Sequence, residues 1–126
     1  MAKSVNDLVI DAALDVIATS GSQAVCQGQP TTRTEALVTN ALATNALTTG
    51  DGAGDYTISN GDTSGRKINV AQQASVTVTA TGSANHIAYC DATNLLFVTT
   101  CTSQVLSAIG NTVTIGTHDI EISDPA

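Results

Sequence analysis

Apolar residues at the start of the chain recur at the i, i+3, i+4, i+7 and i+8 spacing of an amphipathic helix. They are Val5, Leu8, Val9, Ala12, Ala13, Val16 and Ile17. Ser4 is placed to cap the first turn by accepting a hydrogen bond from the backbone amide of Asp7, and Gly21 to end the helix in a left-handed conformation. The pattern predicts a helix over residues 4–20.

The polar stripe of this helix consists of Asp7, Asp11 and Asp15, and none of them has a cationic partner four residues later. Their mutual repulsion must be offset by packing of the apolar side chains. We therefore expect a docked helix, held either against its own sheet or against a neighbouring molecule.

The rest of the chain, residues 23–126, shows short β-type segments separated by turn residues. Residues 75–81 alternate between Val or Ala on one face and Thr on the other, whereas 87–90 and 95–98 are continuously apolar and are expected to be central strands covered on both faces. Residues 60–65 begin with Asn-Gly and indicate a hairpin loop, and residues 91–94 indicate a turn. The predicted strands are 23–27, 41–48, 56–59, 66–70, 75–81, 87–90, 95–98, 112–115 and 118–123, with a short helix near 34–40 as the alternative within the ALVTN-ALATN-ALTT quasi-repeat.

Short strands at this density predict a single domain, residues 1–126, that is mainly β: an antiparallel β-sandwich or barrel-like domain with one N-terminal amphipathic α-helix. The final two strands are expected to point Val113, Ile115, Ile120 and Ile122 inward. Twenty threonines support the β assignment, and an aromatic content of only 2% means that the core is built from small aliphatic residues.

Charge limits the function classes. Four basic residues stand against eleven acidic ones, and no Lys or Arg follows Lys67. Because phosphate neutralisation needs clustered cations, nucleic-acid binding and docking on anionic membranes are not expected.

The aspartates of the N-terminal segment, Asp7, Asp11 and Asp15, interrupt any signal-peptide core, and no apolar run reaches eighteen residues. Synthesis and retention in a cytosol-like compartment are therefore expected. Three cysteines without CxxC spacing indicate free thiols.

Several residue groups suggest chemistry but fail on geometry. His86 and Cys90 would lie about 13 Å apart along a strand, too far to share a metal ion. His118 would point away from Asp119 and Glu121, which favours a structural role for the histidine. If residues 91–94 form the turn, Cys90 opposes Leu95 and lies at the far end of the hairpin from Cys101, which rules out a disulfide between the two.

Two loop motifs are also weak. GDTSG, which contains Ser64, lacks the flanking residues and the two-lobed scaffold of the proteases it superficially matches. The loop at 50–55 offers Asp51 and Asp55 as calcium ligands but lacks the rest of a calcium-binding loop, so a solvated loop is favoured. The sequence predicts no catalytic residue, no metal and no cofactor, and the protein is not expected to be an enzyme.

Five segments together give the chain a family likeness: VNDLVIDAALDVI, QPTTRTEA, ISNGDTSGRKINVA, ATNLLFVTTCTSQVLS and IEISDPA. The chain resembles small structural proteins encoded in tailed-bacteriophage virion gene clusters. The resemblance spans nearly the full chain and implies a virion component made in the cytoplasm of a bacterial host. It implies foremost a head decoration, or cement, protein that binds the major capsid protein and copies of itself as a homotrimer on the head surface.

The alternative is a tail- or fibre-associated subunit that contacts a host-surface glycan or receptor. Loops 28–35, 50–55 and 60–65 would then gather at one end of the domain. For the assembly reading, the expected interface residues are Val5, Leu8, Val9, Ala12, Arg66, Lys67, Ile68 and Val70. Arg33, Arg66 and Lys67 are expected to be solvated, or to pair with acidic groups of this chain or of a partner.

Overall fold

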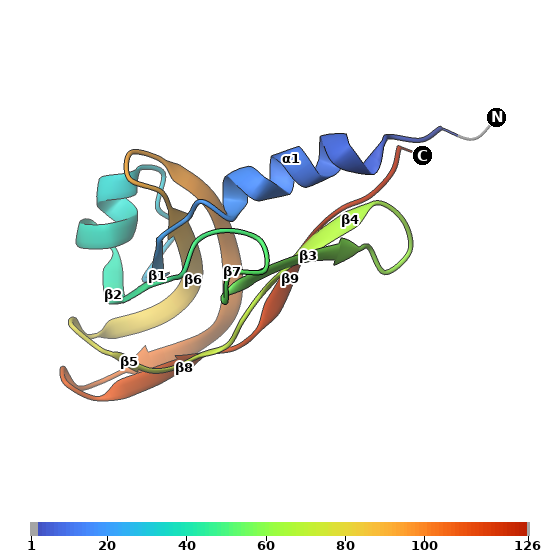
Figure 1. Ribbon diagram of the computed structural model, residues 1–126. Helices are drawn as coiled ribbons and strands as arrows, with labels where there is room; N and C mark the ends of the chain where they lie inside the picture. The colour runs from blue at the N-terminus through green and yellow to red at the C-terminus, as the bar shows by residue number, and fades with distance from the viewer. Residues whose placement is uncertain (1–2, 126) are drawn as a thin grey trace.

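The computed structural model describes residues 3–125 (Figure 1). They contain one α-helix, one short π-helix and nine strands, and the strands form three antiparallel sheets. The sheet orders are β2-β1-β6-β7, β3-β4-β9 and β5-β8. A mainly β domain with antiparallel sheets and one N-terminal α-helix is thus confirmed, and the sheets do not close into a barrel. The elements are α1 (Asp7–Ile17), β1 (Ser22–Cys26), η1 (Glu35–Thr39), β2 (Ala41–Ala46), β3 (Tyr56–Asn60), β4 (Arg66–Val70), β5 (Gln73–Thr77), β6 (Gly82–Cys90), β7 (Leu95–Leu106), β8 (Thr112–Ile115) and β9 (His118–Ile122).

Helix α1 is shorter than the predicted 4–20, and both predicted caps are wrong. The side chain of Asn6, not Ser4, caps the helix by accepting from the backbone N–H of Leu8 at 2.9 Å. The helix ends at Ile17 with Ala18 as its C-cap, and Gly21 does not adopt a positive φ. A left-handed residue is not needed, because the N–H of Ala18 bonds within the last turn and Ser20 donates to the carbonyl of Ile17 at 2.9 Å.

Packing of α1 joins two of the sheets. Ile10 and Leu14 are buried in one cluster with Tyr56, Ile68 and Tyr89, which come from β3, β4 and β6. Figure 1 shows α1 lying across the four-stranded sheet at one end and the three-stranded sheet at the other. The helix therefore bridges the two sheets through its buried side chains.

Strands β1 and β6 form the interior of the largest sheet. Val25 contributes to a cluster on one face, while Ala24 and Ala88 pack with η1 on the other. The prediction that 87–90 is central and covered on both faces is confirmed. Residues 95–98 were predicted to be central as well, but they lie in β7, the edge strand, and are only half-buried. Their apolar run reflects packing on both faces, with Phe97 against the α1 cluster and Val98 against the η1 cluster, and not a central position.

The quasi-repeat after residue 33 contains both of the competing elements. Residues 35–39 form the short π-helix η1, and residues 41–46 form β2, so the helix near 34–40 and the strand from 41 are consecutive.

The predicted alternation of residues 75–81 is confirmed: Val76 and Val78 are buried, and the intervening threonines are exposed. Of the four residues expected to point inward near the end of the chain, Ile115 and Ile120 are buried and Val113 is half-buried, but Ile122 is 36% exposed because it lies at the end of the β4–β9 ladder, opposite Arg66.

A glycine at the tip of the β3–β4 hairpin allows the hairpin to approach the C-terminal segment. Gly65 has φ +70, and a Cβ there would lie 2.0 Å from the carbonyl oxygen of Ile122 in the segment that leaves β9. The backbone of the hairpin tip thus approaches the C-terminal segment more closely than any side chain would permit.

Replacing Gly65 with Ala should destabilise the fold far more than replacing Gly110 with Ala. Both glycines have positive φ, but Gly110 has open space where its Cβ would go. Strain of about 1–2 kcal/mol is common to both variants, so the difference isolates the clash with Ile122. Urea denaturation measures both free energies of unfolding, and equal losses would show that the hairpin moves away from the C-terminal segment at little cost.

Candidate interaction surface

Helix α1 presents a second apolar face that nothing in the described chain covers. Leu8, Val9 and Val16 have 77%, 62% and 54% of their surface exposed, and Ala12 and Ala13 are exposed beside them. At about 100° per residue, these five positions span about 140° of the helix surface. We call them the outer face of α1. Because large apolar side chains rarely gather in the open on a monomeric protein, this face is the main candidate for an interaction surface.

The outer face arises because α1 is apolar around about two thirds of its circumference. Its only polar stripe is Asp7, Asp11 and Asp15. The inner apolar positions, Ile10 and Leu14, dock the helix, and the outer positions have no intramolecular counterpart. The apolar pattern of the sequence predicts a single docking face, but in the structure the apolar residues of the helix divide between a buried face and an exposed face.

The expected interface residues divide into three groups. Leu8, Val9 and Ala12 lie on the outer face, and Val5 is partly buried against the core cluster. Ile68 and Val70 were expected at the interface, but their side chains are fully buried in the core, so a partner docking on the folded chain does not reach them. They belong to β4, whose alternate residues turn inward beneath α1.

Arg66 and Lys67, the remaining two, are engaged within the chain. Arg66 Nε donates to Asp11 Oδ1 at 2.7 Å, and its Nη1 donates to Asn60. The hydrogen bond with Asp11 raises the pKa of Arg66 above its usual value. Lys67 Nζ contacts Asp62 at 2.6 Å and Asp119 at 3.3 Å. Of the alternatives left open for these cations, the structure shows pairing with acidic groups of the same chain.

The rim of the outer face is acidic. Asp11 is neutralised by Arg66, but within residues 3–125 neither Asp7 nor Asp15 lies within 4.0 Å of a cation. Both aspartates are exposed. A partner on this face therefore meets an apolar strip that is bordered along one side by carboxylates.

The histidine expected to be structural points inward. His118 Nε2 lies 2.7 Å from the hydroxyl of Tyr89, which also accepts from Gln23 Nε2 at 2.9 Å. Tyr89 and Gln23 are fully buried. Asp119 and Glu121 are exposed on the opposite side of β9, as the strand alternation predicted. His118 thus satisfies a buried hydroxyl.

The thiols are free, as predicted, and burial suppresses their reactivity. Cys26, Cys90 and Cys101 form no disulfide. Burial raises the pKa of Cys26 to about 11 and also raises those of Cys90 and Cys101. Since the thiolate is the nucleophile, the raised pKa values slow the reaction of these thiols at neutral pH, and of the three only Cys101 is partly exposed.

The loop carboxylates considered for calcium bind backbone amides. Asp51 accepts from the N–H of Ile58 at 2.8 Å, and Asp55 accepts from the N–H of Thr48 at 2.6 Å. Ser64 accepts from the backbone of Asp124 at 3.2 Å. Across residues 3–125, no group of three or more His, Cys, Asp or Glu side chains is placed to hold a metal ion. The same part of the chain has no helix long and apolar enough to cross a membrane.

No protein-family model, curated protein sequence or solved structure matches the chain.

Two leucines on α1 provide a matched test of the two faces. Leu14→Ala should lower the free energy of unfolding by about 2–5 kcal/mol, because Leu14 is fully buried. Leu8→Ala should change it by less than about 0.5 kcal/mol, because that side chain is exposed. Chemical denaturation of the isolated protein measures both, and a large loss for Leu8→Ala would mean that the outer face is covered in solution.

The two buried tyrosines predict loss of stability at alkaline pH. Burial raises the pKa of Tyr56 to about 12 and raises that of Tyr89, while tyrosine in an unfolded chain ionises near pH 10. The stability from keeping the phenols neutral is complete below about pH 10 and is lost as the pH rises towards 12. Tyrosinate absorbance should appear only together with unfolding detected by circular dichroism. Tyrosinate signal from the folded protein would contradict this burial.

Proposed function

We propose that this protein is a structural component of a tailed-bacteriophage virion, foremost a decoration protein that stabilises the head by bridging major-capsid subunits as a homotrimer. The observation that carries the proposal is the outer face of α1, a helix surface with Leu8, Val9 and Val16 open to solvent. Covering it contributes about 1.5–3 kcal/mol for each large side chain that becomes fully buried. A protein that acts by assembly uses such a face, and a freely diffusing enzyme does not need it.

Two segments within the resemblance support the same helix. GDTSGRK forms the hairpin tip and the start of β4, and DIEISDPA includes most of β9. The segments touch where Gly65 meets Ile122 and where the N–H of Asp62 donates to Glu121 at 3.2 Å. Arg66, in the first of them, binds Asp11 of α1. These two segments thus build the support on which α1 is held.

A tail location with a receptor-binding role has less support. That reading expected loops 28–35, 50–55 and 60–65 to gather at one end, but residues 28–35 and the β3–β4 hairpin tip lie at opposite ends of the molecule (Figure 1). The loop at 50–55 is further restrained by the backbone contacts of Asp51 and Asp55. The loops therefore do not form a common recognition surface.

The test of the outer face is incorporation into particles. Leu8→Gln combined with Val16→Gln keeps good helix formers on α1 while removing its apolar surface. Loss of two such contacts should lower incorporation at least about tenfold, since each 1.4 kcal/mol is a factor of ten. The matched control is Val38→Gln with Ile109→Gln, which removes two comparably exposed residues elsewhere. Quantitative mass spectrometry of purified particles measures both variants.

Normal incorporation of the α1 double variant would contradict the assembly role of this face. The location is tested separately by cryo-electron microscopy of the parent particle and by the copy number per virion. Density on the head and hundreds of copies are expected, together with DNA release at a lower temperature when the protein is removed. Density confined to the tail would overturn the head assignment in favour of the tail-associated subunit.

A further inference from the structure

A second open surface lies between β7 and β8, away from α1. Beginning at β7, the strands follow one another as β7-β6-β1-β2, and β2 continues to β5 through the Ala43–Val78 bridge and the Thr79 N–H bond to Leu42 at 2.8 Å. Strand β8 pairs with β5. This ring of six strands stays open at one place, because β7 pairs only with β6, and β8 only with β5, among the strands of residues 3–125.

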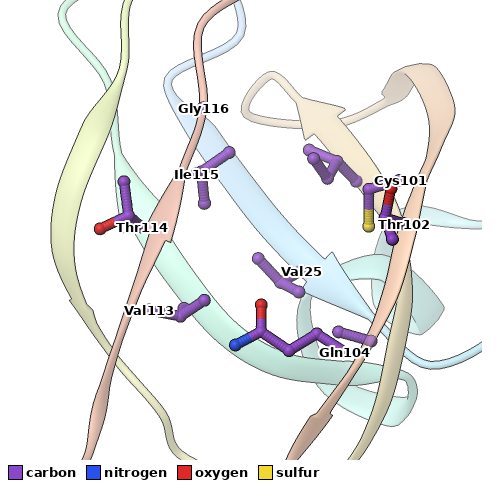
Figure 2. A pocket seen from close by; sticks show the side chains of 10 residues that line it. Val25, Cys101, Thr102, Gln104, Val113, Thr114, Ile115 and Gly116 are labelled. Atoms are coloured by element: carbon purple, nitrogen blue, oxygen red, sulfur yellow. The ribbon is translucent and has the colours of Figure 1, made fainter.

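The opening is a groove with an apolar floor. Two adjoining cavities of about 200 and 280 Å³ share Ile87, Cys101 and Gly116 as lining residues. Figure 2 looks into the cavity of about 200 Å³, which Val25 also lines: β8 with Val113 and Ile115 stands on one side, and β7 with Cys101 and Gln104 on the other. Side chains from inside the ring are therefore accessible between two strand edges.

Both sides of the groove offer unused backbone hydrogen bonds. The outer edge of β7 is open along residues 99–104, a length of about 20 Å in an extended chain. Residues 99–106 read TTCTSQVL, with no charge and no proline to block pairing. Proteins normally protect a long edge with such residues or with a bulge. The edge of β7 lacks the residues, its pairing with β6 shifts register between Thr100 and Gln104, and its extended parts are a template for another strand. The unpaired edges specify an extended backbone as the occupant.

The charge and composition of the groove lining further limit which segment can bind there. Residues 99–104 and 113–117 carry no charged side chain; the lining reaches His118 and Asp119 only at one end. A complementary segment is uncharged and places small or β-branched apolar side chains at alternate positions over Val25 and Ile87. The segments outside the helices and strands at the two ends of the described chain, residues 3–6 and 123–125, include Lys3, Asp124 and Pro125 and do not fit.

We propose that the β7–β8 groove is an acceptor site for a strand from another polypeptide, which adds an uncharged extended segment of about six residues and closes the ring. The added strand forms main-chain hydrogen bonds with both edges, and its inward side chains fill the groove. This site is distinct from the outer face of α1, since β8 lies on the opposite side of the molecule (Figure 1). The proposal does not depend on whether the protein decorates the head or the tail.

The alkylation rate of the Cys101 thiol measures whether the β7–β8 groove is occupied. It lines the groove and is partly exposed, whereas Cys26 and Cys90 are buried and serve as internal references. The probe is the peptide acetyl-TVTVTV-amide with a polyethylene glycol tail for solubility, added to the full chain at up to about 1 mM. Alkylation of Cys101 by iodoacetamide, followed by mass spectrometry, should slow by a factor of 1 + [L]/Kd, about tenfold at ten times the Kd.

Two controls separate strand addition from other effects. The same peptide with alternate amides N-methylated loses its hydrogen-bond donors and should not protect Cys101. Gln104→Trp fills the groove and should abolish protection, whereas Val105→Trp, on the next residue of β7 and outside the groove, should retain it. Amide hydrogen exchange along residues 99–104 and 112–115 should slow in parallel with Cys101 protection in the wild-type chain.

The proposal is overturned if the unmodified peptide protects neither Cys101 nor these amides at the highest concentration. It is equally overturned if the N-methylated peptide protects Cys101 of the wild-type chain as well as the unmodified peptide does. The same holds if the unmodified peptide protects Cys101 equally well in the Gln104→Trp variant and in the wild-type chain. Circular dichroism confirms that both tryptophan variants are folded. Since these measurements use the isolated protein, their failure leaves the particle-incorporation result for α1 unaffected.

Discussion

The packing of α1 across two sheets is the contact on which the rest of the architecture depends. Ile10 and Leu14 share a buried cluster with residues of β3, β4 and β6, and the Arg66–Asp11 ion pair fixes the helix laterally on β4. The helix thus adds its buried side chains to the apolar cluster in which the three-stranded and four-stranded sheets meet. Because the helix is apolar on two sides, the contact that completes the core also turns Leu8, Val9 and Val16 outward.

A core of small residues leaves the sheets incompletely joined. Only Tyr56, Tyr89 and Phe97 are aromatic, and alanines and valines fill much of the three buried clusters. The six-stranded ring stays open between β7 and β8. The protein thus has two kinds of unsatisfied surface, an apolar helix face and a pair of strand edges. Both suit binding by shape to other chains.

Groups that could support chemistry are used to stabilise the fold. His118 satisfies Tyr89, Asp51 and Asp55 accept from loop amides, and Arg66 and Lys67 pair with carboxylates of the same chain. Such contacts rigidify loops that would otherwise be free to adapt to a ligand. These polar side chains are engaged within the chain, and the two open surfaces are formed mainly by Leu, Val and Thr side chains.

Sequence patterns determined the type and position of most elements, because alternation and turn residues act locally. The β3–β4 hairpin, the two faces of residues 75–81 and the central position of 87–90 follow from such signals. The outer residues Leu8, Val9 and Ala12 were predicted as contacts, but the same reasoning included Ile68 and Val70, which the core buries. Only tertiary structure decided which side of α1 docks, that β7 is an edge, and that β7 faces β8 across a groove. These depend on contacts between residues far apart in the chain, for which a single sequence carries no periodic signal.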